Sequence, residues 1–337
     1  MTSEPIDTRP AHRHAGLILQ NPTRSLLSIS GEERLSYLQG LLCQDVATQT
    51  AGTLRYGFLL NPKARILFDA WIGARSEDLL LSPSGTSEED FVVHLKKYLF
   101  FRTNASITSL TASYRSLTLV GKEAPTLATP LFSNESANDG VRTLAGGGLA
   151  FLRPHQFAFD RESGAWIDFW IPVDRFDEVA TALKHRVLSI GGMVLDPKGF
   201  ETYRLERGIP LPPSELNEGH FPAEAGLDTI AVSYNKGCYV GQEPVTRLKF
   251  QGQLSRKLTG LRSKSVTLSE TSCPRTLFSS VDGSEAGLIT SLVPSILAGS
   301  IIGLGYIKRN HWEPGTILID GSGQSFEVSD FPFYSAE

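Results

Sequence analysis

The stretch YNKGCYVGQEPVTRLKFQGQLSR, residues 234–256, places a cysteine, two glycines, an acid–amide pair and a basic run in one short span. Gly237 and Gly241 favour a tight turn, because glycine accepts backbone angles that other residues avoid. Pro244 suits the first turn of a helix, and residues 245–250 have the spacing of a short amphipathic helix. The stretch therefore predicts a turn that leads directly into a helix.

The chemical interest of this stretch lies in Cys238. A thiol just before a helix N-terminus, with Lys236 two residues away, is placed where the thiolate form is favoured. Free cysteine is also a common packing residue, so a purely structural thiol in a tight turn fits equally well. The residues alone leave both interpretations open.

A family resemblance is carried by the octapeptide KGCYVGQE, residues 236–243. It resembles the KGCYxGQE signature of the YgfZ group within the folate-binding YgfZ/GcvT superfamily. The continuation is similar as well, with matching residues at Arg247, Phe250, Gly252 and Arg256. The related glycine-cleavage aminomethyltransferases (T-proteins) share only the aromatic-x-Gly core here and lack the cysteine. The resemblance therefore implies the YgfZ group rather than the T-proteins.

Length and composition indicate a globular protein with more than one domain. The chain has 337 residues, of which 41% are hydrophobic and 20% charged, and it is too long for one compact core. A formal charge of −4 argues against a dominant nucleic-acid-binding surface. Cys43, Cys238 and Cys273 are widely spaced without a CxxC pattern, so we expect a reducing compartment and neither a disulfide framework nor a self-contained metal site.

No targeting or membrane-spanning segment is predicted. Residues 1–16 lack the apolar core of a signal peptide, and we expect His12 and His14 to lie in a mobile tail. The apolar stretch at 292–307 is interrupted by proline and glycines, which argues against a membrane span. We therefore expect a cytoplasmic protein with no membrane partner and no direct nucleic-acid binding.

The order of predicted elements repeats along the chain. RSLLSISG (24–31) and RSLTLVG (115–121) each open a strand, which is followed by a helical pattern, further strand-like runs, a second helix and a last strand. Each half reads as β-α-β-β-α-β, the ferredoxin-like or split βαβ arrangement. After about residue 258, short strands rich in Gly, Ser and Pro predict a small β-barrel. We predict three parts, namely 1–112, 113–257 and 258–337.

The resemblance implies the same organisation. Members of the superfamily have an α+β fold of two interleaved ferredoxin-like units and a C-terminal antiparallel β-barrel domain, arranged around a central opening that holds folate. The implied cofactor is tetrahydrofolate or a folate derivative. The similarity covers nearly the whole chain, although it is weaker outside residues 199–256.

The first candidate site lies in NPKARILFDAW, a predicted hairpin with Asn61 in its loop and Asp69 on its second strand. The family has a similar N-x-KGRIL-x-D stretch, with glycine where this chain has Ala64. T-proteins carry a paired-Asp motif here that supplies the carboxylate for aminomethyl transfer. This chain has Phe68 and Asp69, so only one acid remains. A solvated hairpin with charged edges is the alternative.

A second candidate lies in WIDFWIPV, where Trp166 and Trp170 flank Asp168 on its own face of a strand. A carboxylate beside aromatic rings suits a pterin, because it can accept the ring N–H groups while an indole stacks on the ring. T-proteins resemble this arrangement with a glutamate at the matching position. An exposed aspartate on a sheet face is the alternative.

Two arginines are candidates for holding the carboxylates of a folate tail, because guanidinium groups bind carboxylates bidentately. They are Arg204 and Arg247. Arg204 lies three residues after Glu201 on a predicted helix, so a structural ion pair fits equally well. His220 lies in a Pro-rich loop, and we expect it at the surface.

With the resemblance included, we predict catalytic roles for Cys238, Lys236 and Asp69 and no metal ligands. The predicted cofactor-binding residues are Asp168, Trp170, Arg204, Asn61, Tyr239, Gln242, Glu243 and Arg247. The resemblance implies a folate-binding protein that assists iron–sulfur cluster assembly or repair in client enzymes, including tRNA-modifying ones. Iron–sulfur client or assembly proteins are then its partners.

Two other functions stay open at this stage. One is a T-protein-like aminomethyl or one-carbon transferase that uses Asp69 and tetrahydrofolate. The other is a thiol enzyme with Cys238 as nucleophile, which would need a histidine base that the signature does not supply. Whether the protein is an enzyme is therefore undecided.

Overall fold

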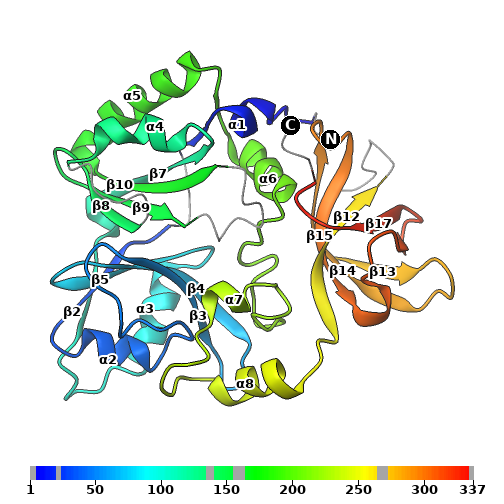
Figure 1. Cartoon of the computed structure of the whole chain (residues 1–337), viewed down its shortest axis with the longest axis horizontal. Coiled ribbons are helices and arrows are strands. Elements are labelled where there is room, and N and C mark those ends of the chain that lie inside the picture. The colour runs from blue at the N-terminus through cyan, green and yellow to red at the C-terminus, as the bar shows by residue number, and fades with distance from the viewer. Residues whose placement is uncertain (1–4, 20–23, 134–139, 155–163, 264–271, 334–337) are drawn as a thin grey trace.

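The computed structural model describes residues 5–19, 24–133, 140–154, 164–263 and 272–333. Two open sheets and a closed barrel make up its β-structure. The sheets lie one above the other, and the barrel stands beside them (Figure 1). This is the predicted α+β fold of two ferredoxin-like units with a C-terminal antiparallel β-barrel.

The first sheet has the strand order β3-β4-β5-β2-β6. Helices α2 and α3 pack their apolar side chains against one face of this sheet. Ser87 caps α3 by accepting a hydrogen bond from the backbone N–H of Asp90, and three acids in the first turn favour the helix dipole. The elements of this unit are β2 (Leu27–Ser30), α2 (Arg34–Gln39), β3 (Leu54–Leu60), β4 (Ile66–Ala74), β5 (Asp78–Pro83), α3 (Glu88–Lys96) and β6 (Ser106–Ser109).

The second sheet repeats this order and contains one additional strand. Its order is β11-β1-β7-β10-β9-β8, and β1 (Gly16–Ile18) is inserted between β7 and β11. The N-terminal strand thus joins the second unit, which is how the two units interleave. The boundary at 112/113 stays a prediction. The other elements are β7 (Tyr114–Gly121), α4 (Ala124–Ala128), β8 (Gly140–Thr143), β9 (Leu149–Arg153), β10 (Ala165–Pro172), α5 (Phe176–Ser189) and β11 (Met193–Val194).

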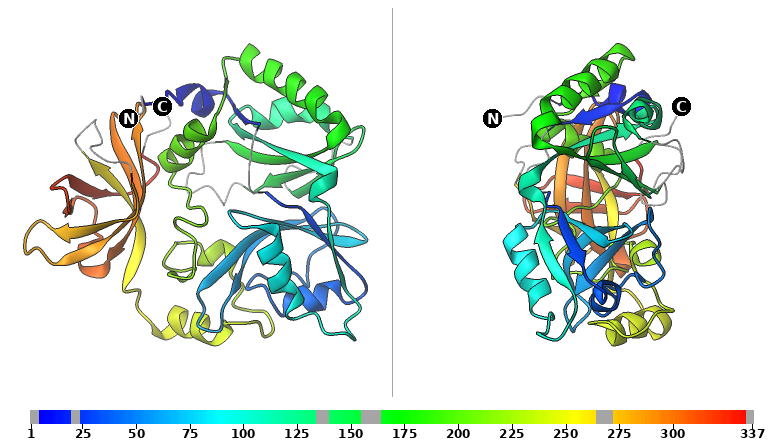
Figure 2. Two further views of the ribbon diagram at one scale, coloured as in Figure 1. Left: turned by 180° about the vertical axis from the view of Figure 1, so that it is seen from behind. Right: turned by 90° about the vertical axis from the view of Figure 1, so that its left-hand side faces the viewer.

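The barrel closes in the order β12-β15-β14-β13-β16-β17, with antiparallel pairing throughout. Its strands are β12 (Arg256–Ser263), β13 (Arg275–Ser279), β14 (Glu285–Ser295), β15 (Ser300–Lys308), β16 (Ile317–Asp320) and β17 (Ser325–Ser329). The connection between the sheets and the barrel contains α6 (Pro197–Glu206), α7 (Asp228–Ala231) and α8 (Gln242–Gln251). Helix α8 lies at the edge between the first sheet and the barrel in both views (Figures 1 and 2).

The N-terminal helix α1 (Arg9–Arg13) is part of the packed structure. His12 is 7% exposed, its Nε2 lies 2.7 Å from Oε2 of Glu206 on α6, and its ring stacks on Tyr203. The expectation that His12 lies in a mobile tail was therefore wrong. His220 is also buried, with its ring stacked on Tyr306 at 3.5 Å, so its expected surface position was wrong as well.

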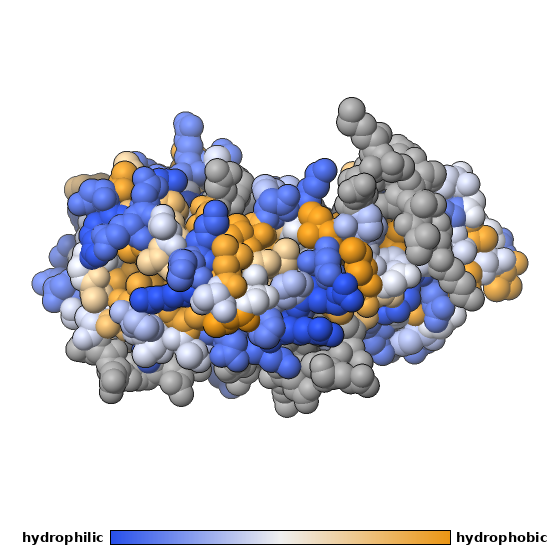
Figure 3. All heavy atoms as spheres, turned by 90° about the horizontal axis from the view of Figure 1, so that it is seen from above, coloured by the Kyte–Doolittle hydropathy of each residue, from blue (hydrophilic) through white to orange (hydrophobic). Residues whose placement is uncertain are grey.

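The two sheets share a core between them. Because side chains alternate along a strand, one face of β10 contributes Trp166 and Trp170 to the same cluster as Tyr56, Phe58 and Trp71 of the first sheet. The opposite faces of both sheets are covered by helices. Seen from above, hydrophobic residues run across the middle of the molecule and are bordered by hydrophilic ones (Figure 3). Within the described residues, no helix is long and apolar enough to cross a membrane.

Candidate functional site

The signature turn is packed against the hairpin turn between β3 and β4. Gly241 has φ +83° and is the N-cap of α8, so the turn leads into a helix as predicted, although the helix starts earlier than residue 245. A Cβ at this position would meet the carbonyl oxygen of Asn61 at 2.7 Å and Cα of Ala64 at 3.3 Å. A side chain at Gly241 would therefore separate the two turns, whereas a Cβ at Gly237 would meet nothing within 4 Å.

Lys236 anchors the signature turn to the end of α2. Its Nζ donates hydrogen bonds to the carbonyl oxygens of Gln39 at 2.7 Å, Leu42 at 2.7 Å and Gln44 at 2.9 Å. These three acceptors use all three N–H groups of the ammonium. Partial burial lowers the pKa of Lys236 to about 8. The structure thus gives Lys236 a positioning role, which differs from the predicted direct action on the thiol.

Of the three thiols, Cys238 is exposed. Cys43 is buried, accepts a hydrogen bond from the N–H of Phe58 and donates to the carbonyl of Ala231. Burial raises the pKa of the Cys43 thiol to about 12 and that of Cys273 to about 11. The anchored turn therefore presents Cys238 to solvent, while the other two thiols are held in the protonated form.

We expect Cys238 to be the thiol that reacts with a disulfide reagent in the native protein. Cys43 should react at least about a thousandfold more slowly, because it is buried and its thiolate is disfavoured. The check is the time course of thiol modification in the wild type and in Cys238→Ser. A fast phase that survives in Cys238→Ser would contradict the exposed position.

The other predicted residues of the signature do not converge on one point. Tyr239 is buried, and its hydroxyl finds no hydrogen-bond partner among the described residues. Gln242 lies within α8, with Nε2 3.5 Å from the carbonyl oxygen of Lys236. Glu243 and Arg247 are exposed on α8. The structure thus brings Tyr239 and Gln242 to Lys236 and leaves the two charged residues in solvent.

Asn61 shapes the β3–β4 turn. Its side-chain oxygen accepts hydrogen bonds from the N–H groups of Lys63 at 2.9 Å and Arg65 at 3.0 Å. Ala64 adopts φ +61°, the left-handed conformation that glycine takes most readily, and its methyl group is fully buried. The hairpin therefore forms with alanine in place of the family's glycine, and Asn61 supports the turn.

A buried polar cluster lies between the two sheets and is centred on Asp168. This carboxylate is fully buried and accepts hydrogen bonds from Thr118 Oγ1 at 2.7 Å and Trp166 Nε1 at 3.1 Å. Arg153 Nε donates at 2.7 Å, and Arg24 forms an ion pair at 2.5 Å. Both carboxylate oxygens are engaged, so Asp168 is neither the exposed aspartate nor the free pterin acceptor that the sequence suggested.

The two arginines of this cluster were missed in the sequence. Arg153 ends the apolar strand β9, and a charged residue on the inward face of such a run was the available signal. Its guanidinium lies over the rings of Trp71 at 5.0 Å and Trp166 at 4.4 Å. Arg24 precedes β2 and carries no comparable signal, because only the tertiary fold brings it to Asp168.

Asp69 is buried on the face of the first sheet that is directed at the second sheet, the face that also carries Tyr56. Tyr56 Oη donates to Asp69 at 2.8 Å, and the backbone N–H of Ser84 donates at 3.1 Å. Burial raises the pKa of Asp69 to about 6, against opposing effects that include the charge of Arg24. Arg24 therefore acts on both Asp69 and Asp168.

The neighbouring position 68 does not face this cluster. Phe68 packs against Phe91 and His94 of α3, with ring centroids 5.4 and 5.2 Å apart. Adjacent residues of a strand point to opposite faces, so an acid at position 68 would not lie beside Asp69. The lack of a second acid there carries less weight against aminomethyl transfer than the sequence suggested.

The raised pKa of Asp69 predicts a pH-dependent contribution to stability. In the unfolded chain an aspartate titrates near pH 4, so the folded protein binds the proton more tightly. This contribution is complete below the unfolded pKa and is lost as the pH rises from about 4 through 6. From pH 4 to 7, the free energy of unfolding of Asp69→Asn should therefore rise relative to wild type by about 2–3 kcal/mol. Denaturant titrations at both pH values check this, and an unchanged difference would contradict it.

Two buried polar atoms between the sheets find no hydrogen-bond partner among the described residues. They are Nε1 of Trp170 and Oγ of Ser82, and both residues are 1% exposed. Ser82 pairs with Trp71 across β5 and β4. Because unpaired buried polar groups are costly, atoms of this kind indicate a place where a ligand or water can bind.

Arg204 connects α6 to the barrel through hydrogen bonds that use its whole guanidinium group. Its five N–H groups meet Glu201 twice, the carbonyl of Ile209, Glu215 and Ser291. The residue is 2% exposed. No donor is left for a folate carboxylate, so the structural ion pair is the interpretation that fits Arg204.

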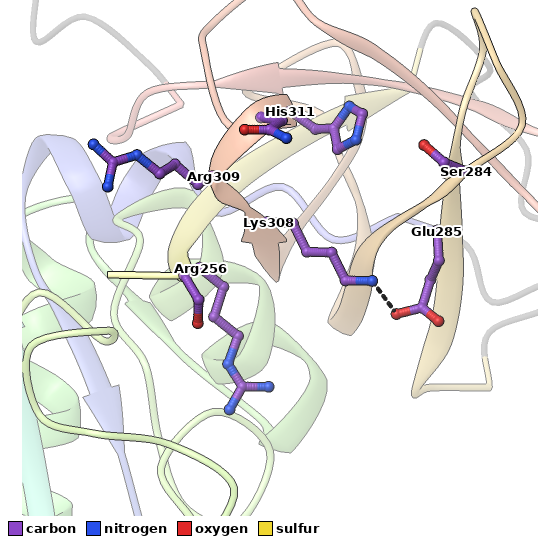
Figure 4. Close-up of a pocket in the computed structure, with 8 residues that line it drawn as sticks. Arg256, Ser284, Glu285, Lys308, Arg309 and His311 are labelled. Carbon is purple, nitrogen blue, oxygen red and sulfur yellow. Dashed lines mark ion pairs between the residues drawn. The ribbon is translucent and has the colours of Figure 1, made fainter. Parts of the chain in front are cut away.

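A cavity of about 580 Å³ at the barrel rim contains none of the predicted site residues. It is lined by Ser255, Arg256, Ser284, Glu285, Lys308, Arg309, Asn310 and His311. Lys308 is paired with Glu285 at 2.8 Å, and Arg256 with Glu224 at 3.2 Å. The basic side chains point in different directions (Figure 4), so this cavity does not form a convergent anion site.

The two facing sheets with an attached barrel define the fold of the GcvT-type proteins. The chain resembles the crystal structure of glycine cleavage system aminomethyltransferase T from Bartonella henselae, with a TM-score of 0.82, 19% sequence identity and coverage of 97% of this chain and 88% of that chain. Residues 8–148 match the family model described as the GCVT N-terminal domain. The chain thus has a GcvT-type fold, and its residues 8–148 are similar to the GCVT N-terminal domain.

The chain is similar both to aminomethyltransferases and to a tRNA-modifying protein. An aminomethyltransferase of Saccharopolyspora erythraea is 28% identical over 320 residues, covering 91% of this chain and 84% of the relative. The tRNA-modifying protein YgfZ of Sodalis glossinidius is 25% identical over 246 residues, covering 71% of this chain and 69% of the relative.

Proposed function

We propose that this GCVT-domain protein binds tetrahydrofolate or a related folate between its two sheets and acts as a YgfZ-like factor. It would assist iron–sulfur cluster assembly or repair in client enzymes, including tRNA-modifying ones, through Cys238. The observation that carries the proposal is an exposed thiol on a turn anchored at two points. Lys236 binds the end of α2, and Gly241 packs on the β3–β4 turn.

The residues between the sheets fit a flat, hydrogen-bonding guest. The unpaired Nε1 of Trp170 can donate to a ring carbonyl, whereas Trp71 and Trp166 already lie under the guanidinium of Arg153. Asp168 acts as a positioning residue that holds the charges of Arg24 and Arg153 in place. Of the two arginines considered for the folate tail, Arg247 keeps its donors in solvent and stays the candidate.

The thiol would act on the client rather than on the folate. Cys238 can bind an iron atom of a client cluster as a thiolate, and Lys236 fixes the turn from which it does so. One thiolate cannot hold a cluster unaided, so the client or a small thiol must supply the other ligands. This requirement makes a protein partner part of the proposal.

Aminomethyl transfer is the second candidate, and a specific observation favours it. Burial raises the pKa of Asp69 to about 6, which is close enough to neutrality for proton exchange with a bound one-carbon carrier. In that case Asp69 would be essential and Cys238 dispensable. The two functions therefore predict opposite effects of substitutions at Asp69 and Cys238.

The test uses a host that lacks its own protein of this kind. The wild-type chain should restore the activity of an iron–sulfur tRNA-modifying enzyme, and Cys238→Ser should fail. Cys273→Ser is the matched control, because its thiol is partly buried and held in the protonated form. Full restoration by Cys238→Ser would overturn the thiol role, and aminomethyl transfer lost only in Asp69→Asn would support the second candidate.

A further inference from the structure

The segment after α3 exposes three large apolar side chains. Phe100 is 72% exposed, Phe101 94% and Val93 51%. The N–H of Thr103 bonds to the carbonyl of Phe100 at 2.9 Å, which places Phe101 at a corner of a tight turn. Such corners usually carry Gly, Pro, Asn, Asp or Ser. Two adjacent exposed phenylalanines at this place indicate an interaction surface.

Three exposed cations border these apolar side chains. The backbone N–H of Lys97, the C-cap of α3, bonds to the carbonyl oxygen of Val93 at 3.3 Å, so Lys97 follows Val93 by one helical turn. Phe100 comes after the helix has ended at Lys96. Lys96 and Lys97 are exposed, and the guanidinium of Arg102 lies 5.5 Å from the ring centre of Phe101. In the part of the chain that the structure describes, none of the three cations forms an ion pair. We call this surface the basic aromatic tip; it consists of Val93, Lys96, Lys97, Phe100, Phe101 and Arg102.

Exposed acidic residues lie on both sides of the tip, namely Glu89 on α3, four residues before Val93, and Glu32 and Glu33 beside Asn104. Glu32 and Glu33 bind Asn104, through its side-chain amide and its backbone N–H respectively. These hydrogen bonds hold the two carboxylates at Asn104 without removing their charge, and among the described residues neither is paired with Lys96, Lys97 or Arg102. A second copy of the chain is disfavoured as that partner, because three like charges would face three like charges.

The sequence predicted no membrane partner, but on the exposed side chains of this segment we propose that the basic aromatic tip binds the surface of an anionic lipid bilayer. Phenylalanines at a turn can enter the boundary between headgroups and acyl chains, while flanking cations contact anionic headgroups. Lysine is depleted in protein–protein interfaces but favourable beside anionic lipids, which argues for lipid over an acidic protein. A protruding tip also needs a complementary pocket on a protein, whereas a lipid surface adapts to it.

Helix α8 offers a matched control for this proposal. Phe250 is 70% exposed, close to the value for Phe100. The adjacent Lys249 is paired with Asp228 at 2.9 Å, and the ring of Phe250 lies against Tyr234 with centroids 6.0 Å apart. An exposed phenylalanine is therefore present there with one exposed cation nearby that forms no ion pair among the described residues, Arg247, in place of the three at the tip.

The experiment is co-sedimentation of the full chain with vesicles of phosphatidylcholine, alone or mixed with phosphatidylserine. The wild type should bind the mixed vesicles, and binding should weaken as salt is raised. Lys96→Gln with Lys97→Gln should weaken it about thirtyfold, from two charges lost near the surface. Phe100→Ser with Phe101→Ser should weaken it at least about tenfold, while Phe250→Ser should leave it unchanged.

Several outcomes overturn the proposal. If the wild type does not bind mixed vesicles, the proposal fails and an acidic protein is the alternative partner. If it binds neutral vesicles equally well, the cations play no part. If Phe250→Ser weakens vesicle binding as much as the change at Phe100 and Phe101, any exposed phenylalanine suffices. Circular dichroism of each variant keeps a loss of binding distinct from a loss of fold.

Discussion

Replacing Asp168 by alanine is expected to destabilise the folded protein by about 3–5 kcal/mol. The substitution leaves Arg24 and Arg153 buried without their shared carboxylate, since the side chains of these arginines are 5% and 2% exposed. Uncompensated buried charges cost far more than a lost surface ion pair. Chemical denaturation of the wild type and the variant measures the effect.

Thr118→Val is the matched control for this substitution. It removes one hydrogen bond to Asp168 and leaves both ion pairs in place, so the free energy of unfolding should fall by only about 1 kcal/mol. A loss below about 1 kcal/mol in Asp168→Ala would contradict the buried network. It would also return Asp168 to the role of a free pterin acceptor.

Replacing Arg204 by methionine is expected to destabilise the folded protein by a similar amount, about 3–5 kcal/mol. Glu215 is fully buried and would lose its cation, keeping only Ser291 and the N–H of Leu211 as partners. The substitution also removes a link between α6 and β14, so the barrel should loosen from the α/β units. Hydrogen exchange of the α6 amides, together with denaturation, checks this.

Glu201→Gln provides the control for Arg204. Its side chain is 39% exposed, so its ion pair with Arg204 should contribute less than about 1 kcal/mol. If Arg204→Met were as stable as Glu201→Gln, Arg204 would not be a structural residue. Its assignment to a folate carboxylate would then need to be reconsidered.

The repeated order of strands and helices was predictable because it depends on local periodicity. RSLLSISG and RSLTLVG each mark the strand from which a unit begins. Each unit then follows the order β-α-β-β-β-α-β, which has one strand more between its helices than the predicted β-α-β-β-α-β. The insertion of Gly16–Ile18 into the second sheet was not predictable, because a three-residue strand has no periodicity of its own. The interleaving came from the family resemblance instead.

The sequence predicted which face of a strand each site residue occupies, but it did not predict the hydrogen-bond and ion-pair partners of these residues. The two-residue period of a strand correctly placed Trp166, Asp168 and Trp170 on one face. The same period directs Phe68 and Asp69 to opposite faces of the first sheet. The partners of Asp168 come from β7, β9 and the segment before β2, and only the tertiary fold brings these together.

Nearness in sequence was misleading for Lys236. Two residues from Cys238, it suggested an electrostatic effect on the thiol, yet its ammonium is directed at three carbonyl oxygens near the end of α2. Gln39 is the last residue of α2, where carbonyl groups lack partners within the helix and attract a cation, and Leu42 and Gln44 lie in the segment that follows. A lysine on a loop therefore has competing acceptors that the sequence does not reveal.

The measurement that tests the central claim most directly is a calorimetric titration of tetrahydrofolate into the wild type, Trp170→Phe and Cys238→Ser. The wild type should bind, and Trp170→Phe should bind about tenfold more weakly, because it keeps an aromatic ring but loses the unpaired N–H. Cys238→Ser should bind as the wild type does, because the thiol is exposed on its turn and not between the sheets. An absence of binding to the wild type, or an equal loss in Cys238→Ser, would contradict a folate site between the sheets that is separate from the thiol.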